Sequence, residues 1–121
     1  MKLATGVDLI EINRIEEVIA RHGKHYLDRI YTLAELEQCG KRTESLAGRF
    51  AAKEAVVKAL GCGIGDVTWK EIEVLGDELH APKLTLTGVA KQKADEQGLT
   101  TWSVSISHSM SHSVALVVAI G

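Results

Sequence analysis

The 121-residue chain contains few aromatic residues (4%), one proline and two cysteines. Two cysteines without a C-x-x-C spacing exclude a disulfide framework, so we expect Cys39 and Cys62 to be small apolar side chains. No apolar run approaches the roughly 18–20 residues of a membrane span. The first residues lead into a strand-like pattern rather than a signal peptide. We therefore expect a cytoplasmic protein that does not contact membranes.

The charge balance is nearly even, with 14 Lys and Arg against 16 Asp and Glu and a net charge of −2. This balance argues against a non-specific nucleic-acid-binding protein, which is normally basic. The length and the 45% hydrophobic content fit one globular domain over residues 1–121. Because a small core with few large rings buries little surface, we also expect copies of the chain to associate.

The periodicity of apolar residues predicts an α+β fold, with helices packed on an antiparallel sheet. Alternation over residues 3–9 predicts an N-terminal strand. The predicted helices run from a capping box at 13–16 to Gly23, from a second capping box at 32–35 to near Gly40, and over about 45–60 before Gly61. Strands are predicted around 72–74 and 84–86, separated by a turn at residues 76–77. A helix is predicted at 88–97. It is followed by strands at 102–106 and 114–120, which are joined by a turn at 109–112.

Residues 49–60 have apolar side chains in nearly every direction of a helix, which predicts that this helix is buried. Glu54 lies among them, and a buried charge requires a partner. An ion pair with Lys58, four residues later, is the commonest solution. The alternative is that Glu54 binds a ligand.

Asp8 interrupts the first strand on the face of Ala4 and Gly6, whose small side chains leave space beside it. It could cap the next element, as aspartates at strand ends often do. A carboxylate with free volume beside it also suits Mg²⁺, which is usually held by one or two carboxylates plus substrate phosphates. Asp8 and Glu54 form such a site only if the fold brings them together.

Three other features have an ordinary structural interpretation and a functional one. His108 is either a strand-end residue with one hydrogen bond or a ligand, and its spacing to His112 across a turn disfavours a helical metal site. The glycines at 61–65 follow a helix, which favours a helix C-cap and bend over a phosphate loop. The basic residues around the first helix form a solvated face or receive an acidic partner; they are Arg14, Arg21, Lys24 and Arg29.

Three segments together resemble the holo-[acyl-carrier-protein] synthase family, the small 4′-phosphopantetheinyl transferases of bacterial fatty-acid synthesis. They are GVDL at residues 6–9, RFAAKEA at 49–55 and SISHS at 105–109. The resemblance covers essentially the whole chain. It implies transfer of 4′-phosphopantetheine from coenzyme A to a serine of apo acyl carrier protein, which releases adenosine 3′,5′-bisphosphate. It further implies Mg²⁺ held by Asp8 and Glu54, and a base for the serine, which would be Glu54 or a water at the metal.

The resemblance also implies roles for other residues and an assembly. Lys58 is expected to bind the departing phosphate and to be catalytic together with Glu54. A homotrimer is expected, with the coenzyme site between subunits. Because acyl carrier proteins are acidic, Arg14, Arg21 and Lys24 become the expected docking face. The residues expected to bind coenzyme A are Arg49, Lys53, Lys58, Gly63, Gly65 and His108.

Two other functions stay open at this point. The chain could be a non-catalytic nucleotide- or coenzyme-binding module, with Glu54–Lys58 a structural pair and Asp8 a cap. It could also be a zinc hydrolase that uses Asp8, His108 and His112, which would bind its metal tightly.

Overall fold

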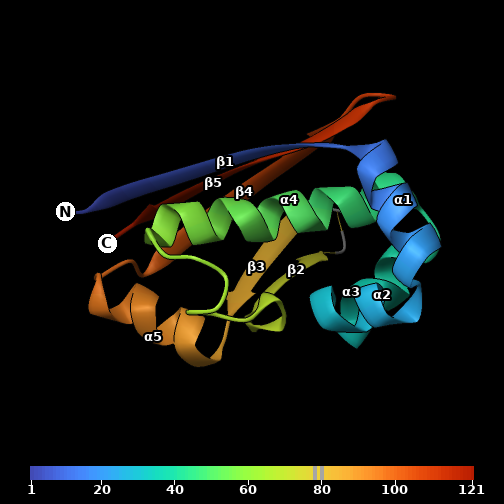
Figure 1. Cartoon of the computed structure of the whole chain (residues 1–121). Coiled ribbons are helices and arrows are strands. Elements are labelled where there is room, and N and C mark those ends of the chain that lie inside the picture. Colours follow the sequence, from blue (N-terminus) through green and yellow to red (C-terminus); the bar gives the residue numbers. More distant parts are fainter. Residues whose placement is uncertain (78, 80) are drawn as a thin grey trace.

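The computed structural model describes residues 1–77, 79 and 81–121. Helices and strands are mixed along the chain (Figure 1). The strands form one three-stranded and one two-stranded sheet. The elements in order are β1 (Leu3–Glu11), α1 (Ile12–His22), α2 (Lys24–Ile30), α3 (Leu33–Cys39), α4 (Thr43–Leu60), the 3-10 helix η1 (Trp69–Glu71), β2 (Ile72–Gly76), β3 (Pro82–Leu86), α5 (Gly88–Glu96), β4 (Thr101–His108) and β5 (His112–Ile120).

The larger sheet has the order β1-β5-β4, with both pairings antiparallel, and α4 lies along one of its faces (Figure 1). Alternate residues of β5, such as Ala115 and Val117, are fully buried against the helix. Helix α4 also contacts β2, α1 and α3, so it is enclosed on several sides. The distribution of apolar residues around the helix predicted this burial. It ends at Gly61, whose left-handed backbone conformation closes the helix as predicted.

Helices α1, α2 and α3 gather at the start of α4 and enclose a second apolar cluster that includes Ile15, Tyr31 and Leu46. The capping box predicted at 32–35 is present at α3. The one predicted at 13–16 is wrong, because β1 runs directly into α1 and the helix begins at Ile12. Helix α2 was not predicted, since it has seven residues and no side-chain cap.

The strands β2 and β3 form a separate antiparallel pair rather than part of one sheet. The α+β class, the positions of both strands and helix α5 agree with the predictions. The connection after the predicted turn at 76–77 includes residues 78 and 80, which lie outside the described residues. In the part of the chain that the structure describes, no helix has the length and apolar character needed to cross a membrane.

Candidate active site

The structure brings Asp8 and Glu54 together where β1 meets α4. Asp8 lies inside β1, opposite Ala115, on the side of the sheet that faces the helix. Both carboxylate side chains line one pocket of about 360 Å³, together with Arg14, Tyr26 and other residues. The interpretation of Asp8 as a strand-end cap is therefore wrong, because its strand continues to Glu11.

Lys58 lies one turn after Glu54 on α4, but its partner is Asp8. The Lys58 ammonium donates to Asp8 Oδ1 at 3.1 Å and to the Val7 carbonyl at 2.9 Å. Among the described residues the ion pair of Lys58 is with Asp8, so the predicted Glu54–Lys58 pair is wrong. Burial, and then the charge of Asp8, raise the pKa of Glu54, while Lys58 lowers it. Within the described part of the chain, Glu54 thus makes no ion pair with a cationic side chain.

The close approach of β1 to α4 depends on Gly6. A Cβ atom built at this position would lie 1.9 Å from the Ala55 carbonyl oxygen, which is helix backbone and cannot move aside. Asp8 follows two residues later on the same face of β1, and Glu54 directly precedes Ala55. The missing side chain at Gly6 therefore lets the two carboxylates share a pocket.

We predict that Gly6→Ala separates β1 from α4 and lowers both stability and activity. Overpacking against rigid backbone costs about 1–3 kcal/mol or more, measurable by urea unfolding. Gly48→Ala is the matched control, since its Cβ would meet only the Ile106 side chain, at 2.8 Å. Equal unfolding costs for the two variants would contradict a special role for the Gly6 contact.

The Asp8–Glu54 pocket has the donor chemistry that Mg²⁺ uses when it is shared with a phosphorylated substrate: two carboxylates and space beside them. No group of three or more His, Cys, Asp or Glu side chains among the described residues is arranged to hold a metal. The predicted zinc site of Asp8, His108 and His112 is therefore not formed among these residues, and the geometry does not support the hydrolase interpretation.

Arg49 lies on α4 but lines a different pocket, of about 460 Å³, together with Arg42, Ser45 and Gln38. One guanidinium nitrogen, Nη2, donates to Gln38 Oε1 at 3.3 Å. The Arg49 Nε is buried and has no hydrogen-bond partner among the described residues. Two arginines around a polar cavity form a site suited to an anion. A single chain, however, does not place Arg49 in the Asp8–Glu54 pocket.

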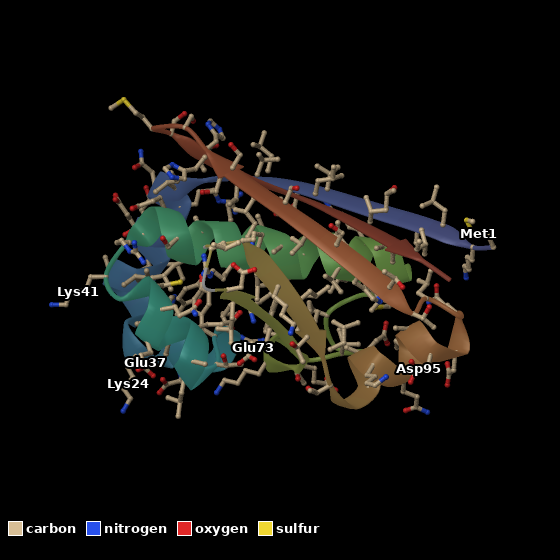
Figure 2. All side chains as sticks on the ribbon, turned by 180° about the vertical axis from the view of Figure 1, so that it is seen from behind. Met1, Lys24, Glu37, Lys41, Glu73 and Asp95 are labelled. Atoms are coloured by element: carbon tan, nitrogen blue, oxygen red, sulfur yellow. The ribbon has the colours of Figure 1, made fainter. Side chains whose placement is uncertain are left out.

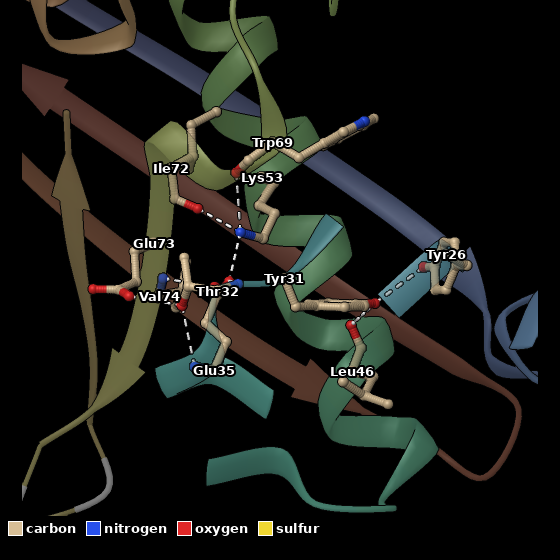
Figure 3. Close-up of polar contacts among 10 residues, drawn as sticks. All are labelled: Tyr26, Tyr31, Thr32, Glu35, Leu46, Lys53, Trp69, Ile72, Glu73 and Val74. Atoms are coloured by element: carbon tan, nitrogen blue, oxygen red, sulfur yellow. Dashed lines mark hydrogen bonds and ion pairs between the residues drawn. The ribbon is translucent and has the colours of Figure 1, made fainter. Parts of the chain in front are cut away.

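Lys53 is fully buried, and its ammonium is used inside the fold (Figure 3). It donates to Glu35 Oε1 at 2.7 Å, to the Ile72 carbonyl at 2.5 Å and to the Trp69 carbonyl at 3.1 Å. Burial lowers the pKa of Lys53, and the Glu35 carboxylate opposes that shift. The predicted contact of Lys53 with coenzyme A does not fit this placement. The residue instead ties α4 to α3, η1 and β2.

The Lys53 network supports one wall of the site, which the sequence analysis missed. Phe50 lines the Asp8–Glu54 pocket, and its ring lies 5.0 Å, between centroids, from that of Trp69. Because Lys53 holds the Trp69 carbonyl, it fixes the backbone beneath this aromatic pair. The sequence carries no signal for this pair, because Phe50 and Trp69 lie far apart in the chain.

The glycine loop lines a different cavity from the Asp8–Glu54 pocket. Gly65 lines a cavity of about 490 Å³ with Trp69, and a neighbouring cavity of about 470 Å³ shares Tyr26 with the Asp8–Glu54 pocket. The Gly63 amide donates to Asp66 Oδ2 at 3.1 Å, so it is already bonded within the loop. His108 is exposed at the end of β4, with Nδ1 3.3 Å from the Ser109 carbonyl.

The three predicted docking residues are all exposed. Arg14 and Arg21 belong to α1, whereas Lys24 begins α2 rather than lying on the same helix as predicted. Arg14 also lines the Asp8–Glu54 pocket. The basic face therefore borders the carboxylate pair.

Comparison with known proteins decides the family. A model of the 4′-phosphopantetheinyl transferase superfamily, labelled ACPS, matches residues 4–117. A holo-[acyl-carrier-protein] synthase of Herpetosiphon aurantiacus is 47% identical over 126 residues, which cover 98% of this chain and 99% of the relative. The chain belongs to the holo-[acyl-carrier-protein] synthase family. The resemblance seen in the three sequence segments is confirmed.

Other holo-[acyl-carrier-protein] synthases agree in sequence and in fold. One from Dehalococcoides mccartyi is 48% identical, covering 97% of this chain and 98% of its own. The crystal structure of the Helicobacter pylori synthase in complex with coenzyme A has a TM-score of 0.88 at 34% identity, covering 96% of this chain and 99% of that one. The crystal structure of the Neisseria meningitidis synthase has a TM-score of 0.88 at 35% identity, with 98% of each chain covered.

Proposed function

We propose that this chain transfers 4′-phosphopantetheine from coenzyme A to a serine of apo acyl carrier protein in the cytoplasm, with Mg²⁺ held by Asp8 and Glu54. The observation that carries the proposal is the shared pocket of these two carboxylates in a member of this enzyme family. A divalent cation there would neutralise charge that develops on the diphosphate during attack by the serine.

Other residues of the chain have proposed roles in catalysis and in coenzyme binding. Glu54 and Lys58 are the proposed catalytic residues, with the Lys58 ammonium binding the departing phosphate. Arg49, whose buried Nε has no hydrogen-bond partner in the described part of the chain, binds an anionic group of coenzyme A. Gly65 and the cavity that it lines with Trp69 bind another part of the coenzyme. Gly63 and His108 are proposed contacts that rest on the family resemblance.

The exposed face of the larger sheet supports assembly into a homotrimer with sites between subunits. Figure 2 shows side chains projecting from this face, and no described element covers it. Leu3, Val7 and Leu9 of β1 are 65%, 54% and 64% exposed, beside Leu116 and Ile120 of β5. An apolar face of this kind on a short chain with a small core is typical of an interface between copies. Such an interface would unite the Arg49 pocket of one subunit with the carboxylates of another.

The acidic carrier protein is proposed to dock on Arg14, Arg21 and Lys24. All three are exposed, and Arg14 borders the carboxylate pocket, so a carrier bound there would bring its serine close to Glu54. We predict that Arg14→Gln with Arg21→Gln raises the KM for the carrier about tenfold and weakens its salt dependence. The exposed Lys91→Gln on α5 is the matched control. If the KM of the double variant depended on salt as that of the unaltered enzyme does, the proposed docking surface would be contradicted.

Intact-mass spectrometry tests the proposed function. The chain is incubated with coenzyme A, Mg²⁺ and apo carrier protein, with EDTA and a carrier whose acceptor serine is replaced by alanine as controls. The carrier should gain the mass of one phosphopantetheine only in the complete reaction. Binding of coenzyme A without any change in the mass of the carrier would favour the non-catalytic binding module instead.

A further inference from the structure

The cation that Asp8 binds in this structure is the chain's own lysine. The Lys58 ammonium lies 3.1 Å from Asp8 Oδ1 and 2.9 Å from the Val7 carbonyl. It therefore binds one of the two carboxylates that line the shared pocket. Its side chain is 53% exposed, whereas that of Asp8 is 18% exposed. The Lys58 side chain is thus hydrogen-bonded only through its ammonium group, and about half of it is exposed to solvent.

This contact differs from the Lys53–Glu35 ion pair, which is buried and bonded on every side. A half-exposed pair contributes little to stability, so Lys58 can leave Asp8 at small cost. A divalent ion bound to Asp8 would lie about 2.0–2.1 Å from a carboxylate oxygen. An ammonium on the same carboxylate would then be a close like charge, so the two cations compete for Asp8.

We propose, on the basis of the proposed function, that Lys58 exchanges partners during binding. In the free chain it occupies Asp8 and weakens binding of the divalent cation. When the coenzyme diphosphate arrives, the Lys58 ammonium transfers to the phosphate oxygens, and Asp8 becomes free to ligate. The divalent cation and coenzyme A therefore bind cooperatively, and Lys58 carries much of the coupling between them.

The test measures Mn²⁺ binding to the full-length chain by electron paramagnetic resonance, with and without coenzyme A. Without coenzyme A, Lys58→Met should bind Mn²⁺ roughly three- to tenfold more tightly than the unaltered chain, because a competing cation is removed. Coenzyme A should tighten Mn²⁺ binding to the unaltered chain and have a much smaller effect on Lys58→Met. Transfer activity should nevertheless fall in this variant.

Two control variants separate competition at Asp8 from a general effect of charge. Arg14→Gln removes a positive charge from the same pocket, but among the described residues Arg14 forms no ion pair with Asp8. This variant should change Mn²⁺ affinity less than Lys58→Met does. Lys58→Arg keeps the cation and should stay within about twofold of the unaltered chain. Weaker or unchanged Mn²⁺ binding by Lys58→Met, or an equal gain in Arg14→Gln, would overturn the proposal.

Failure of the proposed function gives a different result. In that case the unaltered chain would fail to bind coenzyme A, show no change in Mn²⁺ affinity on its addition, and catalyse no transfer. This result would overturn both the proposed transfer reaction and the movement of Lys58 to the phosphate. The affinities of Lys58→Met and Arg14→Gln without coenzyme would still decide whether Lys58 competes at Asp8.

Discussion

Replacing Glu54 by glutamine should reduce phosphopantetheine transfer by about a thousandfold. Loss of the proposed metal ligand would cost several kcal/mol of transition-state stabilisation, and each 1.4 kcal/mol or so is about tenfold in rate. The amide keeps the size of the side chain and removes its charge. The rate is measured from carrier mass at saturating Mg²⁺ and coenzyme A. Transfer at the unaltered rate would contradict the role of Glu54.

The same Glu54→Gln variant should keep its fold and be at least as stable as the unaltered chain. Burial and the neighbouring Asp8 charge both raise the pKa of Glu54, which means that the fold disfavours its ionised form. A neutral amide removes that penalty. Glu44→Gln, in the first turn of the same helix, is the matched control and should leave transfer unchanged. A thermal melt that shows an unfolded Glu54→Gln chain would mean that its inactivity reports folding rather than chemistry.

Two inactive variants should restore activity to each other if the site lies between subunits. Arg49→Met and Glu54→Gln chains are co-expressed with different tags, so that the proposed trimers contain both variants. A site that takes Glu54 from one chain and Arg49 from its neighbour is intact in about a quarter of random pairings. We therefore expect recovery from near zero to about a quarter of the unaltered activity.

Asp8→Asn mixed with Glu54→Gln is the control for this experiment. Both carboxylates line one pocket of one chain, so no pairing of these two variants reconstitutes a site. Recovery by this control pair, or none by the Arg49→Met pair, would exclude the proposed division of the site between subunits.

The local patterns predicted the elements better than their assembly. Strand alternation, the capping box at Thr32 and the glycine at residue 61 depend on neighbouring residues, and each prediction agrees with the structure. Asp8 and Glu54 were singled out as carboxylates in apolar surroundings. Their convergence depends on the Gly6–Ala55 contact between β1 and α4, which no spacing in the sequence specifies.

Lys58 and Lys53 show why partners of charged residues were mispredicted. The helical spacing favoured a pair of Lys58 with Glu54, but β1 brings Asp8 within reach and the ammonium binds there. Lys53 lies within the same motif as Glu54, which suggested a ligand contact. Its side chain instead forms an ion pair with Glu35 of α3, and that long-range pairing has no local signature.

Anomalous diffraction from a crystal of this chain grown with Mn²⁺ and coenzyme A tests the central claim most directly. The proposed site predicts one Mn²⁺ peak within ligand distance of an oxygen from both Asp8 and Glu54, with a coenzyme phosphate oxygen also bound. A peak elsewhere, or a coenzyme diphosphate held without either carboxylate near its metal, would contradict the proposed chemistry.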